Sequence, residues 1–166
     1  MIEQLKAYLW KLVGEKKTQY NRVLPLGDYC VDRWEKANYL KFGKGSSIYD
    51  SSYVFGDVDV GENCWIGPFT ILDGSGAKLS IGDNCHISAG SHIYTHDTVD
   101  TVIHNAPISF APTTIGKNCY IGPNVVISKG VTIGDFVVIG ANSFVNTNIP
   151  SHVKAFGTPA KVYEKK

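Results

Sequence analysis

An aliphatic or aromatic residue recurs every six positions over most of the chain between residues 42 and 145. A second frame, of small or β-branched residues, follows four positions behind the first, and glycine often stands directly after the aliphatic residue. The first frame consists of Phe42, Ile48, Val54, Val60, Ile66, Leu72, Ile81, Ile87, Ile93, Ile115, Ile121, Ile127, Ile133, Ile139 and Val145. Both frames persist through two interruptions, so the repeat describes the architecture and not a local accident of composition.

A period of six residues fits neither a helix of 3.6 residues per turn nor the two-residue alternation of an ordinary strand. It fits a short strand followed by a corner, with two inward side chains in each unit. Such corners require a positive φ, which Gly and Asn adopt more easily than other residues. The third position after the aliphatic residue is rich in these types, as at Asn63, Asn84, Asn118, Asn124 and Asn142. The pattern predicts a parallel β-solenoid whose coils bury a continuous aliphatic column.

The register of the repeat breaks twice. Between Leu72 and Ile81 one unit gains three residues, and between Ile93 and Ile115 the chain is too long for a coil. We therefore expect a loop at about residues 97–113 that leaves the solenoid. Loops that project from a rigid scaffold often carry binding and catalysis.

The two ends of the chain depart from the period. Residues 2–13 place apolar side chains at helical spacing, which predicts an amphipathic helix, and a second helix is expected to begin with Asp28 as its N-cap. These helices would cap the open end of the solenoid. The expected organisation is a helical capping segment at 1–41, a β-helix at 42–149 and an irregular tail at 150–166 with at most one short strand.

Charge and composition narrow the possible functions. Lys and Arg together number 16 and Asp and Glu 15, so no basic field is available to hold nucleic acid. No apolar stretch is long enough to cross a bilayer or to form the core of a signal peptide. We expect a cytoplasmic protein that has no membrane span and binds no nucleic acid.

Cysteine and histidine spacing argues against a metal centre. Cys64, Cys85 and Cys119 occupy the inward small-residue frame, where a thiol acts as a small hydrophobe, and their spacing matches no zinc motif. His92 and His96 lie four residues apart, about 13 Å along a strand, too far for one ion unless the chain turns between them. No metal site is predicted.

The segment Tyr-Thr-His-Asp at residues 94–97 stands at the base of the predicted loop. Together with WIGPFTILDGSG, IGKNCYIGPNVVI and GTPAKVY, it resembles the hexapeptide-repeat acetyltransferases that act on bacterial surface polysaccharides. The chain is more distantly similar to the galactoside and maltose acetyltransferases. The resemblance implies a left-handed parallel β-helix, acetyl-CoA as co-substrate, and a homotrimer with active sites at its subunit interfaces.

By the same resemblance, His96 is the catalytic residue. A sugar hydroxyl is a poor nucleophile near neutral pH, and an imidazole, whose pKa is about 6.5, can accept its proton. On the residues alone a corner role for His96, three positions after Ile93, is equally favoured, and the resemblance favours catalysis. Asp97 would orient the imidazole only weakly, because adjacent strand residues point to opposite faces.

Positions that match the family's coenzyme and acceptor contacts are spread over the second half of the chain. The predicted coenzyme-binding residues are Pro123, Ala141, Asn146, Thr147 and Lys161, and Asp73 is the predicted acceptor-binding residue. Two of these depart from the family pattern: Pro123 cannot donate a backbone N–H, and Asn146-Thr147 stands where relatives often have Thr-Lys. Asp73 can equally be read as a turn aspartate before Gly74.

The resulting hypothesis is an O-acetyltransferase that acetylates a sugar hydroxyl in surface polysaccharide or lipopolysaccharide biosynthesis. An N-acetyltransferase of an amino sugar is the nearest alternative, since an unprotonated amine needs less help from a base. A metal-dependent β-helix enzyme of the γ-carbonic anhydrase type is a second class of function. A non-catalytic solenoid that serves as a scaffold or binds ice is a third.

Overall fold

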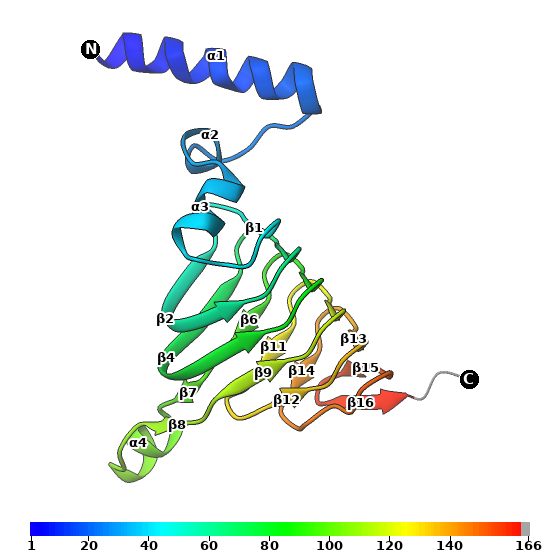
Figure 1. Ribbon diagram of the computed structural model, residues 1–166. Coiled ribbons are helices and arrows are strands. Elements are labelled where there is room, and N and C mark those ends of the chain that lie inside the picture. Colours follow the sequence, from blue (N-terminus) through cyan, green and yellow to red (C-terminus); the bar gives the residue numbers. More distant parts are fainter. Residues whose placement is uncertain (164–166) are drawn as a thin grey trace.

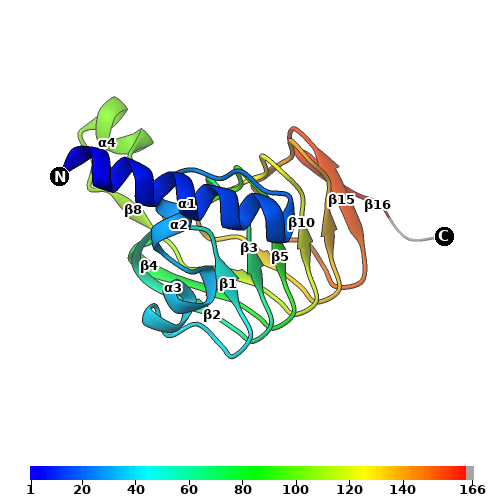
Figure 2. The ribbon, with the colours of Figure 1, turned by 90° about the horizontal axis from the view of Figure 1, so that it is seen from above.

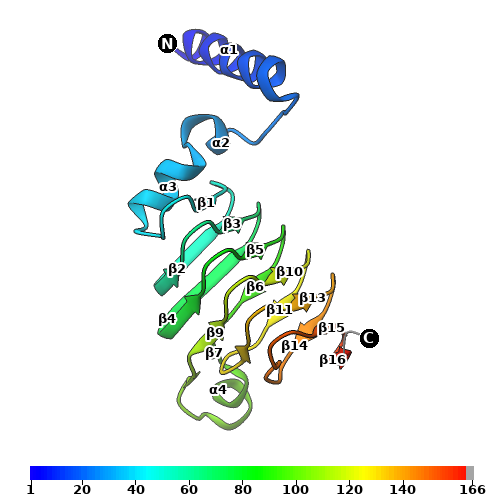
Figure 3. The same ribbon diagram turned by 45° about the vertical axis from the view of Figure 1, so that its right-hand side comes forward.

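The structure is a computed structural model that describes residues 1–163; the last three residues of the predicted tail, 164–166, lie outside the described residues. Its body is the predicted left-handed parallel β-helix, three-sided in cross-section, with helices at its N-terminal end and one loop projecting from its side (Figures 1 and 3). No helix among residues 1–163 is both long and apolar enough to span a membrane.

Three faces of stacked strands make up the solenoid. The first face contains, in order, β1 (Ser47–Ile48), β3 (Trp65–Ile66), β5 (His86–Ile87), β10 (Tyr120–Ile121), β13 (Val138–Ile139), β15 (Lys154–Gly157) and β16 (Ala160–Tyr163) (Figure 2). The second and third faces share the long strands β2 (Tyr53–Val60) and β4 (Ile71–Ile81). The second face adds β6 (His92–Ile93), β11 (Val126–Ile127) and β14 (Phe144–Val145), and the third adds β9 (Thr113–Ile115) and β12 (Thr132–Ile133).

The aliphatic frame forms the core. Along the first face, Ile66, Ile87, Ile121 and Ile139 are paired in register from coil to coil, and all four side chains are fully buried. Neighbouring coils also exchange backbone hydrogen bonds, such as that from Gly122 N to Ile139 O at 2.9 Å. The six-residue spacing therefore satisfies the backbone and buries the apolar side chains at the same time.

The small-residue frame links coils through side chains. Cys64, Cys85 and Cys119 are buried free thiols, and each Sγ donates to a glycine carbonyl of the next coil at 3.1 Å. Ser91 Oγ makes the same contact with Gly122 O at 2.9 Å. Cysteine and serine are therefore interchangeable in geometry here, which agrees with the structural role predicted for the thiols.

Both register breaks lie where the period places them. The first is absorbed by β4, which pairs with β6 at its start and with β9 at its end, and so continues around a corner. Here a Cβ on Gly74 would lie 2.1 Å from Asp57 O, so the close approach of β2 and β4 requires glycine. The second break is the projecting loop, with the antiparallel pair β7 (His96–Asp97) and β8 (Ser109–Phe110) at its base and α4 (Val99–His104) beyond it.

The N-terminal helices differ from the prediction. The helix α1 (Ile2–Tyr20) is longer than predicted and none of its residues is buried, so it does not cap the core. Capping falls to α3 (Arg33–Tyr39), which packs on β1 and buries Ala37. In Figures 1 and 3, α1 lies beyond α2 (Gly27–Cys30) and α3 as seen from the solenoid.

The prediction that Asp28 is an N-cap was wrong. Asp28 lies inside α2, and its Oδ1 accepts a hydrogen bond from Asp50 N at 2.8 Å. The N-cap of α3 is Asp32, whose Oδ1 accepts the N–H groups of Trp34 and Glu35 at 2.9 and 3.3 Å. Aspartate is a favoured N-cap residue at either position, and sequence alone did not distinguish which carboxylate meets the free amides.

The C-terminal tail is more regular than expected. It forms two strands instead of one at most: β15 pairs with β13 and continues the first face, and β16 folds back on β15. Val153 and Ala155 are buried, so the inward alternation continues after the six-residue period is lost.

The core predicts a sharp contrast between two neighbouring residues of β10. Ile121 is fully buried, whereas Tyr120 is 44% exposed on the outer surface. Replacing Ile121 with Ala should lower the free energy of unfolding by about 2–5 kcal/mol, because the close-packed column cannot collapse around the cavity. Tyr120→Ala is the matched control and should cost much less in denaturant unfolding. Equal losses for the two variants would contradict the assigned core.

Candidate active site

His96 lies on β7 at the point where the loop leaves the solenoid. Its Nδ1 is 3.5 Å from Oδ2 of Asp73, a residue of β4, and the side chains are 28% and 9% exposed, respectively. Its backbone φ is not among the positive values that mark the corners, so it does not fill an Asn or Gly corner. The structure therefore brings together the predicted base and the predicted acceptor-binding carboxylate.

Asp73 is held through both its side chain and its backbone. Its carboxylate Oδ1 accepts the N–H of Ser75 at 2.9 Å, and its backbone carbonyl accepts the hydroxyl of the fully buried Thr95 at 2.9 Å. One carboxylate oxygen thus has a partner, while the other is the oxygen nearest the imidazole. His96 Nδ1 is itself buried and has no hydrogen-bond partner among the described residues. A small side-chain rotation that closes 3.5 Å to about 2.9 Å would give it one.

An aromatic side chain from the far side of the loop borders the imidazole. Phe110 pairs with His96 in the β7–β8 ladder, and the two ring centroids are 6.2 Å apart. Gly76, with φ +80°, makes room for this ring, since a Cβ there would lie 2.3 Å from Phe110 Cε1. The Phe110 ring, which is itself 50% exposed, therefore borders one side of the imidazole.

The base of the loop is fastened by groups that the sequence did not reveal. Lys129, which follows β11, forms an ion pair with Asp97 Oδ2, and Asp97 Oδ1 accepts the N–H of Val99 at 3.1 Å. The hydrogen bond from Lys129 lowers the pKa of Asp97. Thr113 Oγ1 donates to Tyr94 O at 2.7 Å, which ties the returning strand to the departing one. Asp97 thus anchors the strand that carries His96, and it faces Lys129 instead of the imidazole.

The other histidine of this region belongs to a separate contact. His92 Nδ1 lies 3.4 Å from the Tyr94 hydroxyl, and burial, with a smaller contribution from the negative charge of Asp73, raises the pKa of Tyr94. Among the described residues, no group of three or more His, Cys, Asp or Glu side chains is arranged to hold a metal ion.

Three of the predicted coenzyme-binding positions lie near one corner of the last coils. Pro123 and Ala141 occupy this corner in successive coils, where Asn142 N donates to Pro123 O at 2.9 Å. The hairpin that carries Lys161 packs against the same corner, because Gly157 N donates to Ser143 Oγ at 3.1 Å.

Asn146 and Thr147 lie on a different corner. Asn146 follows β14, in the column that runs through Ser128 to Tyr94, as shown by the hydrogen bonds from Ser128 N to Val145 O and from Tyr94 N to Ile127 O. This column leads to the base of the loop and to His96. Within one chain, the five predicted coenzyme-binding residues therefore form two groups on two corners of the solenoid.

The ion pair at the base of the loop generates a prediction for Lys129→Met. Losing this partly exposed ion pair should cost little global stability, but β7 and the loop should open more often. Hydrogen exchange of the β7 and β8 amides should therefore speed up severalfold, with little change in the unfolding midpoint. Lys117→Met, which removes the exposed pair with Asp83, is the control and should leave loop exchange unchanged.

The same pair gives a pH dependence with a defined sign. Because Lys129 lowers the folded-state pKa of Asp97, the stabilisation is complete above the ordinary aspartate pKa of about 3.9 and is lost as the pH falls through the lowered value. Wild-type exchange, corrected for the intrinsic pH effect, should approach that of Lys129→Met only in this acidic range. A difference between the two proteins that vanished near neutral pH would contradict the assignment.

Family models match two parts of the chain. The model "Bacterial transferase hexapeptide (six repeats)" matches residues 112–147, and "Hexapeptide repeat of succinyl-transferase" matches residues 57–95. Among solved structures, a hexapeptide-repeat acetyltransferase from Vibrio cholerae is similar with a TM-score of 0.72 and 26% identity, over 98% of this chain and 92% of that one. A galactoside acetyltransferase in complex with coenzyme A has a TM-score of 0.68 and 26% identity, over 95% and 82%.

Similar sequences bear names of the same kind. A putative acetyltransferase of Saccharomyces cerevisiae, YJL218W, is 41% identical over 154 residues, which are 90% of this chain and 71% of that protein. Galactoside O-acetyltransferase of Escherichia coli K12 is 35% identical over 62% of this chain, and the putative colanic acid biosynthesis acetyltransferase WcaF is 33% identical over 64%. The chain spans about three fifths of the length of these last two, 61% and 58%. The family resemblance in the sequence is thereby confirmed: this chain belongs to the hexapeptide-repeat acetyltransferases.

Proposed function

We propose that the protein is an acetyl-CoA-dependent O-acetyltransferase that acetylates a sugar hydroxyl, with His96 as the general base. The observation that carries the proposal is the contact of His96 with Asp73 at the base of the loop, 3.5 Å from Nδ1 to Oδ2. At this place in the chain the imidazole of His96, a side chain suited to proton transfer, lies beside the buried carboxylate of Asp73. Membership of the family supports acetyl-CoA as the donor. The similar galactoside acetyltransferase, whose structure contains coenzyme A, supports it as well.

The chemistry follows from the two imidazole nitrogens. With its proton on Nδ1, facing Asp73, the ring presents an unprotonated Nε2 to an incoming hydroxyl. Nε2 accepts the hydroxyl proton as the oxygen attacks the thioester carbonyl, and the resulting tetrahedral intermediate collapses with loss of the thiolate. The imidazolium then gives its proton to that thiolate, so the base is regenerated without a covalent acyl-enzyme.

Asp73 has a different part in this proposal from the one expected on sequence. Its carboxylate selects the tautomer and orientation of His96 and stabilises the imidazolium, as a buried acid does in other acid–histidine pairs. The N–H of Ser75 and the hydroxyl of Thr95 hold Asp73 in place for this purpose. The same carboxylate can contact the acceptor only through the face that His96 leaves open.

The two groups of coenzyme-binding residues support a subunit interface. Pro123, Ala141 and Lys161 lie on one corner, while Asn146 and Thr147 lie on the column that leads to His96. An acetyl-CoA molecule bound between neighbouring solenoids would meet the first group on one copy of the chain and the second group on the next copy. We therefore include in the proposal the homotrimer, with the reaction at the interface between neighbouring solenoids.

The acceptor is the least constrained part of the proposal. The names of similar proteins point to galactosides and to colanic acid biosynthesis, which supports a sugar hydroxyl in surface polysaccharide production. A histidine base is most useful for a hydroxyl, since an unprotonated amine attacks a thioester without one. The cytoplasmic location expected from the sequence belongs to the same proposal.

The proposal is tested by His96→Ala in a thiol-release assay with acetyl-CoA and a panel of sugars that offer hydroxyl or amine groups. Loss of a general base should reduce kcat for hydroxyl acceptors by about 10²–10⁴-fold, with little change in the KM for acetyl-CoA. His86→Ala, at an exposed histidine of β5, is the matched control and should retain activity. Full activity of His96→Ala, or turnover of amines alone, would overturn the hydroxyl mechanism.

Asp73→Asn separates the two roles of this carboxylate. If Asp73 orients the imidazole, kcat should fall on the order of 100-fold, as for other misplaced catalytic groups, while the KM for the sugar is nearly unchanged. A rise in the KM for the sugar with kcat preserved would assign Asp73 to acceptor binding instead. Steady-state kinetics with the sugar as the varied substrate distinguishes the two outcomes.

A further inference from the structure

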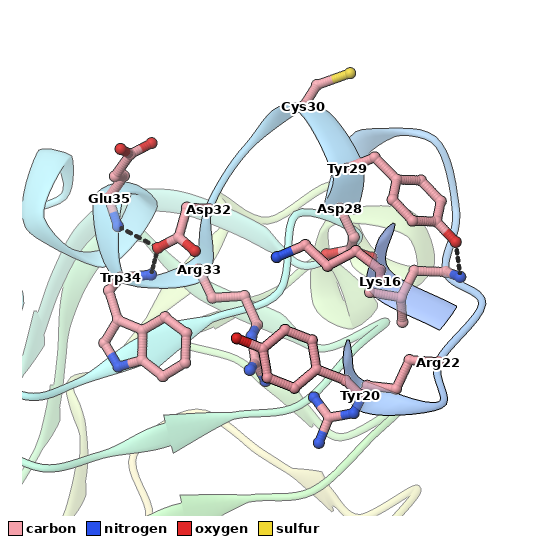
Figure 4. A pocket seen from close by; sticks show the side chains of 11 residues that line it. Lys16, Tyr20, Arg22, Asp28, Tyr29, Cys30, Asp32, Arg33, Trp34 and Glu35 are labelled. Atoms are coloured by element: carbon pink, nitrogen blue, oxygen red, sulfur yellow. Dashed lines mark hydrogen bonds between the residues drawn. The ribbon is translucent and has the colours of Figure 1, made fainter. Parts of the chain in front are cut away.

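A pocket of about 250 Å³ lies outside the solenoid, where the end of α1 faces α2 and α3 (Figure 4). This volume is just below the usual range for small-molecule sites, roughly 300–1,000 Å³. The residues that line the pocket belong to α1, α2, α3 and the segments between them, at the N-terminal end of the molecule, whereas β7, which begins with His96, lies beside the projecting loop (Figure 1). It is therefore separate from the candidate active site of the same chain. Its lining combines cations, aromatic rings and a buried carboxylate: Lys16, Tyr20, Arg22, Asp28, Arg33 and Trp34.

Arg33 is held in place without an acidic partner. Its guanidinium carbon lies 4.7 Å from the ring centroid of Trp34 and 4.7 Å from that of Tyr49. Contacts with aromatic faces leave the N–H donors in the guanidinium plane free, and this planar fork matches the oxygens of a phosphate. Between residues 1 and 163, no hydrogen bond or ion pair involves the Arg33 side chain.

The charges around Arg33 favour an anion. Lys16 lies over the Tyr20 ring at 5.3 Å, and within the described chain neither Lys16 nor Arg22 forms an ion pair. The acidic neighbours are engaged elsewhere: Asp32 accepts the amides that begin α3, and the Glu35 side chain points out of the pocket (Figure 4). Lys16, Arg22 and Arg33 therefore line one pocket, and in the described part of the chain none of them forms an ion pair with a carboxylate.

The aromatic rings offer surfaces for a planar group. The side chains of Tyr20 and Trp34 are each 52% exposed and each has a cation against one face. A ring that is half exposed in this way retains surface on which a flat, electron-poor ring can stack. Phosphate-binding cations beside such surfaces suit a ligand that carries both a phosphate and an aromatic base.

Asp28 supplies an unused hydrogen-bond acceptor. The residue is 8% exposed, and its Oδ2 is buried with no hydrogen-bond partner among residues 1–163, while Oδ1 accepts from Asp50 N. A buried carboxylate oxygen without a hydrogen-bond donor costs free energy. A donor from a ligand, such as a ribose hydroxyl or a base N–H, would satisfy it after a small opening of the pocket wall.

We propose that this pocket binds a nucleoside phosphate. The phosphate meets Arg33, Lys16 and Arg22, the base stacks on Tyr20 or Trp34, and a hydroxyl or N–H donor of the nucleoside reaches Asp28. The proposal does not depend on the acetyltransferase chemistry, because it concerns a different part of the chain.

Isothermal titration of the full-length protein with UDP tests the proposal, with uridine and inorganic pyrophosphate as the two halves of the probe. UDP should bind with one site per chain, at least tenfold more tightly than either half. Arg33→Gln should weaken UDP binding at least tenfold, and Lys16→Gln, at a partly exposed residue, should weaken it in part. Lys6→Gln, on the same helix but outside the pocket, is the control and should bind as the wild type does.

Four results would overturn the proposal. The first is that UDP at millimolar concentration gives no heat of binding, and the second is that pyrophosphate or uridine binds as tightly as UDP. The third is that both pocket variants bind UDP with wild-type affinity. The fourth is that saturating coenzyme A displaces UDP. The last result would assign the nucleotide to the coenzyme site and leave the proposed acetyl transfer untouched. Far-ultraviolet circular dichroism of each variant confirms that it is folded, and Lys16→Gln carries the test if Arg33→Gln is not.

Discussion

Backbone hydrogen bonds between successive coils are the constraint on which the rest of this structure depends. Each short strand pairs only with the strands directly above and below, so every coil must return to the same position after three units. The aliphatic residue that recurs every six positions satisfies this condition, and Asn or Gly at the corners turns the chain through a positive φ. A residue inserted into a unit must either be absorbed by a longer strand or leave the solenoid, because the stacking tolerates no drift.

Both solutions occur in this chain, and they meet at one place. Asp73 lies in the first register break, which β4 absorbs by continuing around a corner. His96 lies at the start of the second, where the chain leaves as a loop. The hydroxyl of Thr95 joins the two breaks directly through Asp73 O. Residues outside the repeat are free to carry side chains suited to catalysis. The solenoid next to them fixes the distance between Asp73 and His96. This explains why the candidate site lies where the two breaks meet.

The period made the solenoid, its core and both breaks predictable, because each is encoded in spacing along the chain. The Lys129–Asp97 pair was not predictable, since it joins residues 32 positions apart and Lys129 has no local signature in Ser-Lys-Gly. The N-cap was wrong for a related reason: Asp28 and Asp32 look alike in sequence, and only the contact of Asp28 with Asp50 removes it from capping. The contact of Asp73 with His96 depended on how three inserted residues are absorbed, which the spacing left open.

The helix α1 also shows what the sequence pattern cannot predict. Its apolar spacing was read as a cap for the solenoid, yet none of its residues is buried and α3 covers the open end. Helical spacing of apolar residues predicts that one face of the helix is apolar, but it does not predict which element covers that face. The helix instead places Lys16 and Tyr20 opposite Arg33 and Trp34, and this arrangement creates the pocket at the N-terminal end. An element that adds little to the core can thus add a binding surface, since the side chains it leaves unburied remain available to a ligand.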